Sequence, residues 1–318
     1  MFESTSTDQK GNPPSGEGGA GGLSPDQELF PIRTVSSITG VNSVTLRAWE
    51  RRYGLIRPKR TAKGHRLYSR EDIHRINQVL GLLERGISIG QVRAALDSHP
   101  AELPERAGPW ADYVARMVDA TIRFDEKALT AIYNDALALY PVEFVTEQLI
   151  VPLLKELGRR WESAEGSVAE EHFFSVYMRN KLGARFHHMS SESRGPKLLC
   201  ACVPYEQHEI ALMLFCLAAM ARNYRVVLLG AQMPFEDLPL AAKRSNCDAV
   251  VLAGSEAAYW PGLEADLRVL VKESPVPVMI GGALSTNHRD EISRAGAAAL
   301  GEDVAQGIRR IGEVLAVN

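Results

Sequence analysis

Hydrophobic residues follow three different spacings along this chain of 318 residues. From Ile32 to about Leu96, short amphipathic segments alternate with tight turns. From Trp110 to Met189 the spacing is that of longer helices, and beyond Gly195 short apolar runs alternate with helical patterns. The pattern therefore predicts a multidomain protein that consists of a small helical head, a helical bundle and an α/β domain.

The head begins with a pattern of two short helices around a glycine. We expect one helix at Val35–Thr39, a tight turn at Gly40, and a second helix that begins at Asn42 or Ser43 and runs through Arg52. Two short helices joined by a glycine-containing turn are typical of a helix-turn-helix.

A basic segment follows these two helices. Residues 57–66 lie between apolar flanks and predict a two-stranded wing with a basic tip. The sequences at Ser69–Asp72 and Ser88–Gln91 resemble capping boxes, which predict the starts of a third and a fourth helix. Together these elements predict a winged helix-turn-helix.

Charge is distributed unevenly between the head and the rest of the chain. Between Phe30 and Leu96 there are thirteen Lys and Arg against four Asp and Glu, whereas the whole chain has a net charge of −3. A basic module on an acidic body indicates a polyanionic partner for the head alone. Arginines on the second helix can enter the major groove of double-stranded DNA, while wing cations hold adjacent phosphates. The residues expected to form this DNA-binding surface are Thr45, Arg47, Trp49, Arg51, Arg52, Tyr53, Arg57, Lys59, Arg60, Lys63, His65, Arg66 and Tyr68.

Three motifs of the head carry a resemblance to a known family. They are Ile32–Val35, Thr45–Leu55 and Gly64–Tyr68, and together they resemble the MerR family of bacterial transcription regulators over about residues 31–97. The resemblance implies a homodimer on a near-palindromic operator, with an effector read by the C-terminal part of the chain.

Composition places the boundaries between the parts. Residues 1–29 are rich in Gly, Ser and Pro and predict a disordered tail, because they cannot bury enough apolar surface to offset their ordering entropy. We expect the DNA-binding domain at 30–97, a Pro- and Glu-containing linker from 98 to about 106, the helical bundle at 106–190, and the α/β domain at 195–318.

The bundle pattern has breaks near Asp125, Pro141 and Gly166, which predict four helices. Trp161 lies near the end of the third helix, and Glu171 and His172 lie near the start of the fourth. We expect these three side chains at one end of the bundle. A core tryptophan beside a solvated helix start is the alternative.

Apolar runs at 197–203, 225–230, 249–253, 277–280 and 298–300 alternate with helical patterns. This alternation predicts a doubly wound, parallel, five-stranded sheet. A GxGxxG fingerprint is missing after the first strand, so NAD is disfavoured as a ligand.

A short polar sequence after the first strand is the best candidate for chemistry in the α/β domain. His208 is expected on the loop at the carboxyl edge of the sheet, where such folds place ligands. Glu206 can accept a hydrogen bond from one ring nitrogen and so make the other a better metal ligand. A solvated loop histidine is the alternative. Gly281 and Gly282 follow the fourth strand at the same edge, where small residues admit an elongated ligand.

A second resemblance rests on Trp161, nine residues, Glu171-His172, and then Glu206-x-His208. The pattern is similar to a cobalamin-binding module, and with the MerR-type head it resembles the CarH/LitR group of light-sensing repressors. The resemblance implies adenosylcobalamin bound with its own base displaced and His208 on cobalt, in a pocket that includes Ala211, Ser255, Gly281 and Gly282. It implies that Trp161, Glu171 and His172 cover the adenosyl face. Family members are dark-state tetramers on the operator, and light releases them from DNA.

The sequence departs from such modules at three places. Ala211 replaces a usual glycine, a crowding of about 1 kcal/mol. After the third strand such modules usually have Ser-x-Leu or Ser-x-Thr, and here Ala253-Gly254-Ser255 occupies those positions. The lost serine hydroxyl removes one polar contact to the tail of the ligand, at a cost of ~1 kcal/mol. Some members have a histidine directly after the tryptophan, and here that residue is Glu162.

These departures leave two alternatives to a light-controlled repressor. One is a MerR-type regulator whose degenerate cobalamin domain responds to a partner protein or another ligand. The other is a corrinoid carrier or methyltransferase subunit, which the basic head argues against. A catalytic partner domain is missing, so we expect that the protein is not an enzyme.

Composition and cysteine usage indicate the cellular compartment in which we expect the protein. The chain is 45% hydrophobic and 24% charged, and no apolar run approaches the roughly eighteen residues of a membrane span. A signal-peptide pattern is missing as well. Cys200, Cys202, Cys216 and Cys247 lie in apolar patterns and are expected to be buried thiols in a reducing compartment. We therefore expect a cytoplasmic homo-oligomer, dimer or tetramer, that does not act on membranes.

Overall fold

The computed structural model describes residues 28–97, 109–163, 165–189 and 193–317. Backbone contacts divide the chain into two compact units. Unit 1 comprises residues up to 85 together with 90–101, and unit 2 comprises 86–89 and everything from 102 onward. The expected disordered tail (apart from residues 28 and 29) and the expected linker lie outside the described residues.

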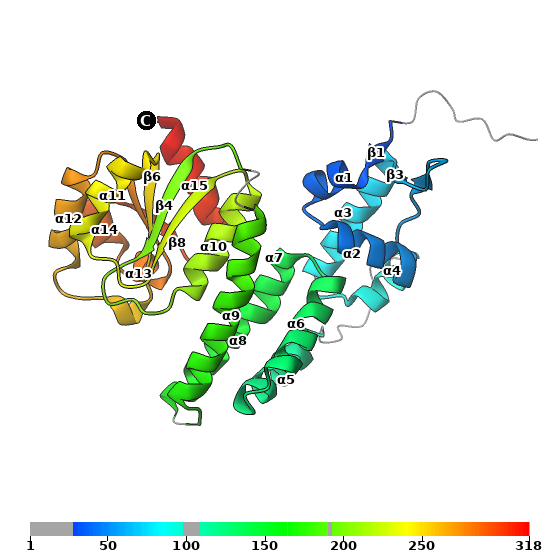
Figure 1. The fold of residues 1–318 in the computed structure, drawn as a ribbon, viewed down its shortest axis with the longest axis horizontal. Helices are drawn as coiled ribbons and strands as arrows, with labels where there is room; N and C mark the ends of the chain where they lie inside the picture. Colours follow the sequence, from blue (N-terminus) through cyan, green and yellow to red (C-terminus); the bar gives the residue numbers. More distant parts are fainter. Residues whose placement is uncertain (1–27, 98–108, 164, 190–192, 318) are drawn as a thin grey trace, which may run out of the picture. The chain divides into compact units, whose positions relative to one another are not determined.

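Unit 1 is a winged helix-turn-helix, as the sequence predicted (Figure 1). Its elements are β1 (Phe30–Pro31), α1 (Ile32–Thr39), α2 (Ser43–Ala48), the π-helical turn η1 (Trp49–Tyr53), β2 (Lys59–Arg60), β3 (Arg66–Tyr68), α3 (Arg70–Glu84) and α4 (Ile89–Asp97). The segment α2–η1 is called the recognition helix below, and residues 57–68 are called the wing.

Local signals fix the turns of unit 1. Gly40 ends α1 with a φ of 73°, which an L side chain rarely adopts. The side chain of Asn42 caps α2 by accepting hydrogen bonds from two backbone N–H groups, both at 2.9 Å, so Asn42 rather than Ser43 is the cap. Ser69 and Asp72 form the expected capping box of α3. The first helix begins at Ile32, three residues before the expected start, because extended Pro31 serves as its N-cap.

The wing belongs to a three-stranded sheet rather than to the expected pair of strands. The order is β1-β3-β2, and both pairings are antiparallel. The sequence missed β1 because two residues, Phe30 and Pro31, carry no alternating pattern. Pairing of Phe30 with Tyr68 ties the wing to the start of α1.

The N-terminal part of unit 2 is the expected helical bundle, with breaks where the sequence placed them. Between the second and the fourth helix, the chain continues through three helical segments without a gap. The elements are α5 (Trp110–Ile122), α6 (Glu126–Leu139), α7 (Val142–Val145), the π-helical turn η3 (Thr146–Ile150), α8 (Val151–Glu162) and α9 (Val168–Met189). Large side chains such as Met117, Leu149 and Phe174 are buried.

The C-terminal part of unit 2 is a parallel sheet in the order β5-β4-β6-β7-β8, as expected. Every strand lies within one residue of its predicted bounds. The strands are β4 (Lys197–Cys202), β5 (Arg225–Gly230), β6 (Ala249–Ala253), β7 (Val278–Gly281) and β8 (Ala298–Gly301). The helices are α10 (Ile210–Ala221), α11 (Leu238–Ser245), α12 (Leu263–Glu273), α13 (Ala283–Asn287), α14 (Arg289–Arg294) and α15 (Val304–Val317), with short 3-10 turns at Phe235–Asp237 and Glu256–Ala258.

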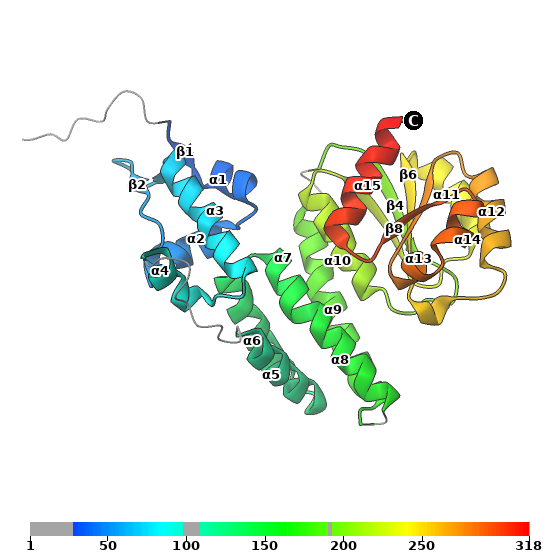
Figure 2. The ribbon, with the colours of Figure 1, turned by 180° about the vertical axis from the view of Figure 1, so that it is seen from behind.

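Helices cover both faces of this sheet, as Figures 1 and 2 show. Side chains of β4 alternate between two cores: Leu198, Cys200 and Cys202 pack with α10 and α15, and Leu199 and Ala201 pack with α11 and α12. All four cysteines are free and buried, which confirms them as packing residues. Within the described residues, the helices lack the length and apolar character needed to cross a membrane.

Candidate functional site

The recognition helix and wing expose most of the cations that the sequence assigned to DNA. Arg47, Arg51 and Arg52 are exposed on the recognition helix. Arg57, Lys59, Arg60, Lys63 and His65 are exposed on the wing, and Tyr53 is half-buried. The exposed arginines of the recognition helix and the exposed cations of the wing are the groups that the sequence expects to meet bases and phosphates.

Three other residues on the expected DNA surface are inside unit 1. Thr45, Trp49 and Tyr68 have no exposed surface, so they hold the recognition helix and wing in place and do not reach base edges. Burial raises the pKa of Tyr68 to about 12. The motif that contains them mixes core and surface positions, which a sequence pattern alone does not separate.

An ion-pair cluster joins the recognition helix to the wing. Glu50 accepts hydrogen bonds from Arg60, at 2.9 Å, and from Arg66. Burial alone would raise the pKa of Glu50, but the two guanidinium groups outweigh it and lower the pKa below its usual value. Arg66 therefore stabilises the head through Glu50, which leaves it less available to DNA than the exposed arginines.

In unit 2, His208 lies on the β4–α10 loop at the carboxyl edge of the sheet, where the sequence placed it. Its Nδ1 is 3.0 Å from Oε1 of Glu206, and its backbone N–H donates to the same oxygen at 2.8 Å. Its Nε2 is 2.9 Å from Oε1 of Glu171, near the start of α9. The imidazole therefore lies between a carboxylate of the loop and a carboxylate of the bundle.

Glu206 is the buried anchor of this site, with 3% of its surface exposed. Its second oxygen accepts a hydrogen bond from the backbone N–H of Ser255 at 2.7 Å, so it connects the β4–α10 loop to the end of β6. Burial opposes ionisation of Glu206, but the hydrogen bonds from His208 and Ser255 prevail and lower its pKa to about 2. Conversely, the hydrogen bond to Glu206 raises the pKa of His208.

A pocket of about 420 Å³ opens at this edge of the sheet. Six residues that the sequence assigned to a ligand line it: Glu206, His208, Ala211, Ser255, Gly281 and Gly282. Most of its other lining residues are apolar or small. The pocket is thus a mainly apolar cavity with one imidazole, a lining typical of a small-molecule or cofactor site.

The floor of the pocket requires glycine. Gly282 has a φ of 89°, and a Cβ at this position would lie 2.4 Å from the carbonyl oxygen of Gly254. A Cβ on Gly254 would in turn lie 2.9 Å from the side chain of Val203. The two loops after β6 and β7 therefore approach each other through bare backbone, and neither glycine leaves room for a side chain.

One polar atom of the pocket lining has no hydrogen-bond partner among the described residues. The hydroxyl of Ser255 is buried, and no described residue hydrogen-bonds to it. Buried hydroxyl groups without a hydrogen bond are unusual, because their desolvation costs roughly 1–3 kcal/mol. Together with the imidazole of His208 and the glycine floor, this hydroxyl fits a ligand with a coordinating centre and a polar tail.

The structure places the three expected bundle residues at the same end of the bundle. Trp161 lies near the end of α8, and Glu171 and His172 lie in the first two turns of α9. Glu171 hydrogen-bonds to His208, whereas Trp161 is 52% exposed and His172 is exposed. In the described part of the chain, no hydrogen bond, ion pair or ring contact joins Trp161 to Glu171 or His172.

The bundle contributes other residues that sequence reasoning missed. Thr146 of η3 and Val151, Leu154 and Lys155 of α8 line the pocket, as do residues of the β8–α15 loop such as Asp303. The i, i+3 spacing of Val151 and Leu154 was the available signal for an inward helix face. A pattern of this kind does not show which neighbour the face meets.

Comparison with known proteins matches the head and the helical bundle to family models and most of the chain to known regulators. A family model described as "MerR HTH family regulatory protein" matches residues 30–99, and one described as "B12 binding domain" matches residues 113–185. The HTH-type transcriptional repressor CarH of Myxococcus xanthus is 31% identical over 83% of this chain and 92% of its own length. The HTH-type transcriptional repressor CarA of the same organism is 31% identical over 84% of this chain and 91% of its own length.

A solved structure shares the fold of unit 2. The monomethylamine corrinoid protein of Methanosarcina barkeri superposes with a TM-score of 0.52 and 21% sequence identity, and the match covers 64% of this chain and 99% of that one. At this identity the likeness concerns the fold.

Proposed function

Because this chain belongs to the CarH-type cobalamin-binding MerR transcriptional regulators, we propose that it is a repressor whose assembly and operator binding are controlled by adenosylcobalamin and light. The observation that carries the proposal is His208, held by buried Glu206 at the mouth of an apolar pocket. The partners are a double-stranded DNA operator and further copies of the same chain, as a dimer or a tetramer, in the cytoplasm.

His208 would hold the cobalt of the cofactor through Nε2, because Nδ1 is engaged by Glu206. The bound cofactor supplies a light-sensitive cobalt–carbon bond. Nε2 has one lone pair, so His208 cannot coordinate cobalt and keep its hydrogen bond to Glu171 at the same time. Binding of the ligand therefore requires Glu171 to give up its hydrogen bond to His208.

Because the pocket is lined by both the bundle and the α/β domain, a bound ligand can change how strongly the two pack together. Thr146 and Leu154 line it from the bundle, and Ala211 and Gly281 line it from the α/β domain. Arg179 of α9 also pairs with Glu209, just before α10, at 2.5 Å. A ligand that contacts both sides would stabilise their packing, and its loss would withdraw that stabilisation.

The proposal is tested by measuring assembly and DNA binding under the same illumination. The operator is a duplex selected from a random library by the full chain in the dark with adenosylcobalamin. Size-exclusion elution and DNA affinity are then compared without cofactor, with cofactor in the dark, and after green light. We expect the largest assembly and the tightest binding in the dark with cofactor. Identical elution and affinity in all three conditions would contradict the proposal.

A regulator that no longer uses light is the second candidate, and two observations favour it. Ala211 adds a methyl group to the pocket lining, and Trp161 is half-exposed at the end of α8, outside the pocket. Under this alternative, cobalamin or another ligand alone changes the DNA affinity, and illumination has no effect.

A further inference from the structure

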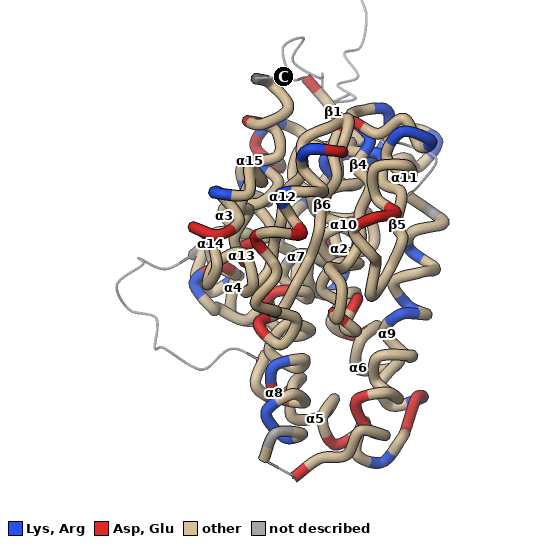
Figure 3. Tube along the Cα trace, turned by 90° about the vertical axis from the view of Figure 1, so that its left-hand side faces the viewer, with Lys and Arg blue, Asp and Glu red and all other residues tan. Residues whose placement is uncertain are grey.

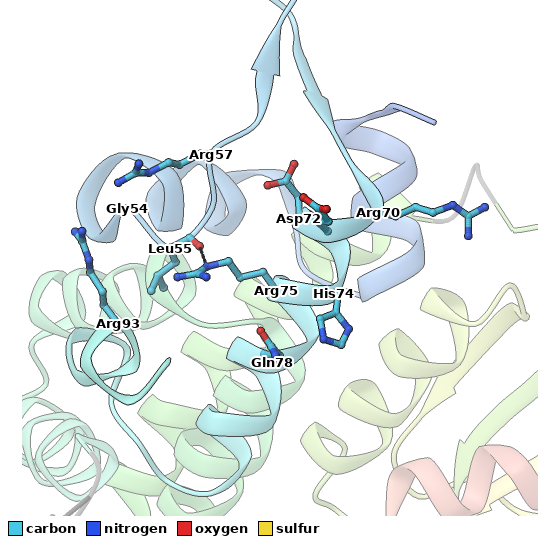
Figure 4. A pocket seen from close by; sticks show the side chains of 10 residues that line it. Gly54, Leu55, Arg57, Arg70, Asp72, His74, Arg75, Gln78 and Arg93 are labelled. Carbon is cyan, nitrogen blue, oxygen red and sulfur yellow. Dashed lines mark hydrogen bonds between the residues drawn. The ribbon is translucent and has the colours of Figure 1, made fainter. Parts of the chain in front are cut away.

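Two cavities that His208 does not line differ in charge. The first, of about 750 Å³, lies in unit 1, where Arg75 and Arg93 lie near Gly54 and Leu55 (Figure 4). It shares the basic character of the surface assigned to DNA. The second, of about 620 Å³, lies in unit 2, and its described lining contains three carboxylates and no Lys, Arg or His.

The second cavity is called the aromatic pocket, because Tyr205, Phe235 and Trp260 line it. It lies beside α12, whereas the pocket at His208 lies beside α10 and α15. In the β4–α10 loop, Glu206 and His208 line the His208 pocket, and Tyr205 lines the aromatic pocket. The two pockets share no lining residue, so the proposed cobalamin site does not account for the aromatic pocket.

Trp260 is the centre of the aromatic cluster. Its ring centroid lies 5.6 Å from that of Tyr205 and 5.7 Å from that of Phe235. Its Nε1–H donates a hydrogen bond to the carboxylate of Asp266 at 2.9 Å, and a Cβ on Gly262 would lie 3.1 Å from Cδ1 of its ring. These contacts hold the indole in one orientation, while 68% of the surface of Tyr205 is exposed. An exposed aromatic ring beside a fixed indole is available to a ligand.

Two residues of the aromatic pocket have a backbone conformation that L side chains rarely adopt. The φ of Tyr205 is 69° and that of Gln232 is 51°. The backbone N–H of Gln232 donates to the carbonyl oxygen of Glu206 at 2.9 Å, which joins the loops after β4 and β5. Non-glycine residues held in this region cluster at ligand-binding sites. The conformation of both loops therefore supports a binding role for the pocket.

Three carboxylates give the aromatic pocket a negative charge. Glu236 comes from the 3-10 turn after β5, and Asp266 and Glu273 come from α12. The neighbouring Arg268 pairs with Glu264 instead, and among the described residues no ion pair involves the three pocket carboxylates. Glu273 is also the last residue of α12, the end of a helix that carries a negative partial charge. The pocket therefore attracts a cation and brings no counter-charge of its own.

We propose that the aromatic pocket binds a small organic cation of the alkylammonium class, held against the rings of Tyr205 and Trp260. Alkylammonium groups are attracted to the faces of aromatic rings, and a tryptophan is the strongest partner of this kind. The volume of the pocket is within the range of small-ligand sites. The inference does not rest on the proposed function, because the pocket shares no residue with the His208 pocket or with the DNA surface.

The test is a calorimetric titration of the full chain, without cofactor, with choline at constant ionic strength. Choline is a trimethylammonium compound, and neohexanol, an uncharged molecule of the same shape, is its matched comparison. We expect saturable binding of one choline per chain. Neohexanol should bind roughly tenfold more weakly, because it lacks the attraction between the cation and the rings. Equal affinities for the two compounds, or no saturable binding of choline, would overturn the proposal.

Substitutions of Tyr205 and His208 locate the bound choline. Tyr205→Leu removes the exposed ring and should weaken choline binding roughly tenfold, whereas Tyr205→Phe keeps the ring and the affinity. His208→Ala should bind choline as the wild type does, since His208 does not line the aromatic pocket. A loss in His208→Ala equal to that in Tyr205→Leu would place choline in the His208 pocket and contradict the proposal.

Two consecutive acidic residues provide a matched pair for the charge. Glu236 lines the aromatic pocket, and Asp237 is exposed beside it but does not line the pocket. We expect Glu236→Gln to weaken choline binding about threefold, the range for an exposed charge pair, and Asp237→Asn to leave it unchanged. Equal losses in the two variants would mean that choline responds to the net charge of this surface, and the assignment of the cation to the pocket would fail.

Discussion

Charged side chains are held in opposite ways in the head and at the edge of the sheet. In the described part of the head, Arg47, Arg51 and Arg52 are exposed and no carboxylate pairs with them. At the sheet edge His208 lies between Glu206 and Glu171, and Arg179 pairs with Glu209. Blue and red positions likewise lie together at the end of α8 in Figure 3, where Arg159 pairs with Glu156 and Glu165.

The difference reflects the two ligands. A polyanion such as DNA brings its own charge, so the arginines of the recognition helix can stay exposed until it binds. At the pocket, Glu206 and Glu171 both hydrogen-bond to the imidazole of His208, which is the group that the site offers to a ligand. We therefore expect the DNA affinity of the head to depend on the salt concentration. We expect the cobalamin affinity of the pocket to depend on single substitutions near His208.

The substitution with the largest expected effect is His208→Ala. It removes the single proposed cobalt ligand and leaves Glu206 without its imidazole partner. We expect adenosylcobalamin affinity to fall by more than about 100-fold, beyond the effect typical of residues that only support a ligand. The measurement is a spectrophotometric titration in the dark, and unchanged DNA binding by the cofactor-free variant serves as the control. An affinity equal to that of the wild type would remove His208 from the site.

Glu206→Gln should have the next largest effect, because the amide keeps the shape but loses the charge that orients His208. We expect a 10- to 100-fold loss of cobalamin affinity, the range for a residue that orients a metal ligand. Glu209→Gln, which changes a neighbouring carboxylate that pairs with Arg179, is the matched comparison. Equal losses for the two variants would mean that net charge, rather than the contact to His208, matters.

Two substitutions in the head separate base recognition from phosphate binding. Arg47→Ala should reduce the preference for the operator by roughly 1–3 kcal/mol, since it removes a candidate base contact. Lys63→Ala should leave the preference intact and lower the salt slope by ~0.9. Competition binding with operator and mixed-sequence duplexes separates the two effects. Identical behaviour of both variants would contradict the placement of the recognition helix in the groove.

Ser255→Ala tests whether the unpartnered hydroxyl serves a ligand. Its removal should weaken cobalamin binding by ~1 kcal/mol, about fivefold, through the loss of one hydrogen bond. The free energy of unfolding of the cofactor-free protein should stay level or rise, because no described residue bonds to this hydroxyl. A variant that loses stability but keeps its cobalamin affinity would show that the hydroxyl is structural.

The smallest effect concerns pH and the Glu50 cluster. Burial would raise the pKa of Glu50, but the hydrogen bonds from Arg66 and Arg60 outweigh it and lower the pKa. Ionised Glu50 therefore stabilises the head at pH values above the ordinary pKa of glutamate, about 4.3. That contribution is lost as the pH falls through the lowered pKa. Hydrogen exchange of the β3 amides should therefore be faster in Glu50→Gln than in the wild type at pH 6. The difference should vanish under acidic conditions, and a difference that persists there would contradict the ion-pair explanation.

Most of the fold could be predicted from the sequence because its signals are local. Asn42, Gly40 and the Ser69–Asp72 box mark the ends of helices directly, and the apolar runs of the sheet are bounded by polar loops. The strand β1 was missed because its two residues are ordered by pairing with β3, a contact distant in the sequence.

The site could be predicted less completely, for a similar reason. Glu206 and His208 are two residues apart and their contact follows from that spacing. Glu171 and Lys155 reach the same pocket from helices of the bundle, and no local pattern fixes which helix face meets the sheet. Thr45, Trp49 and Tyr68 belong to the motif that identifies the head, yet packing inside unit 1 places them in its core.

The most direct test of the central claim is the absorption spectrum of the wild-type chain titrated with adenosylcobalamin in the dark. We predict a saturable spectral change with one cofactor per chain, distinct from the spectrum of free adenosylcobalamin, as expected when His208 replaces the base of the cofactor. A titration whose spectra are the sum of free cofactor and free protein at every step would contradict the account.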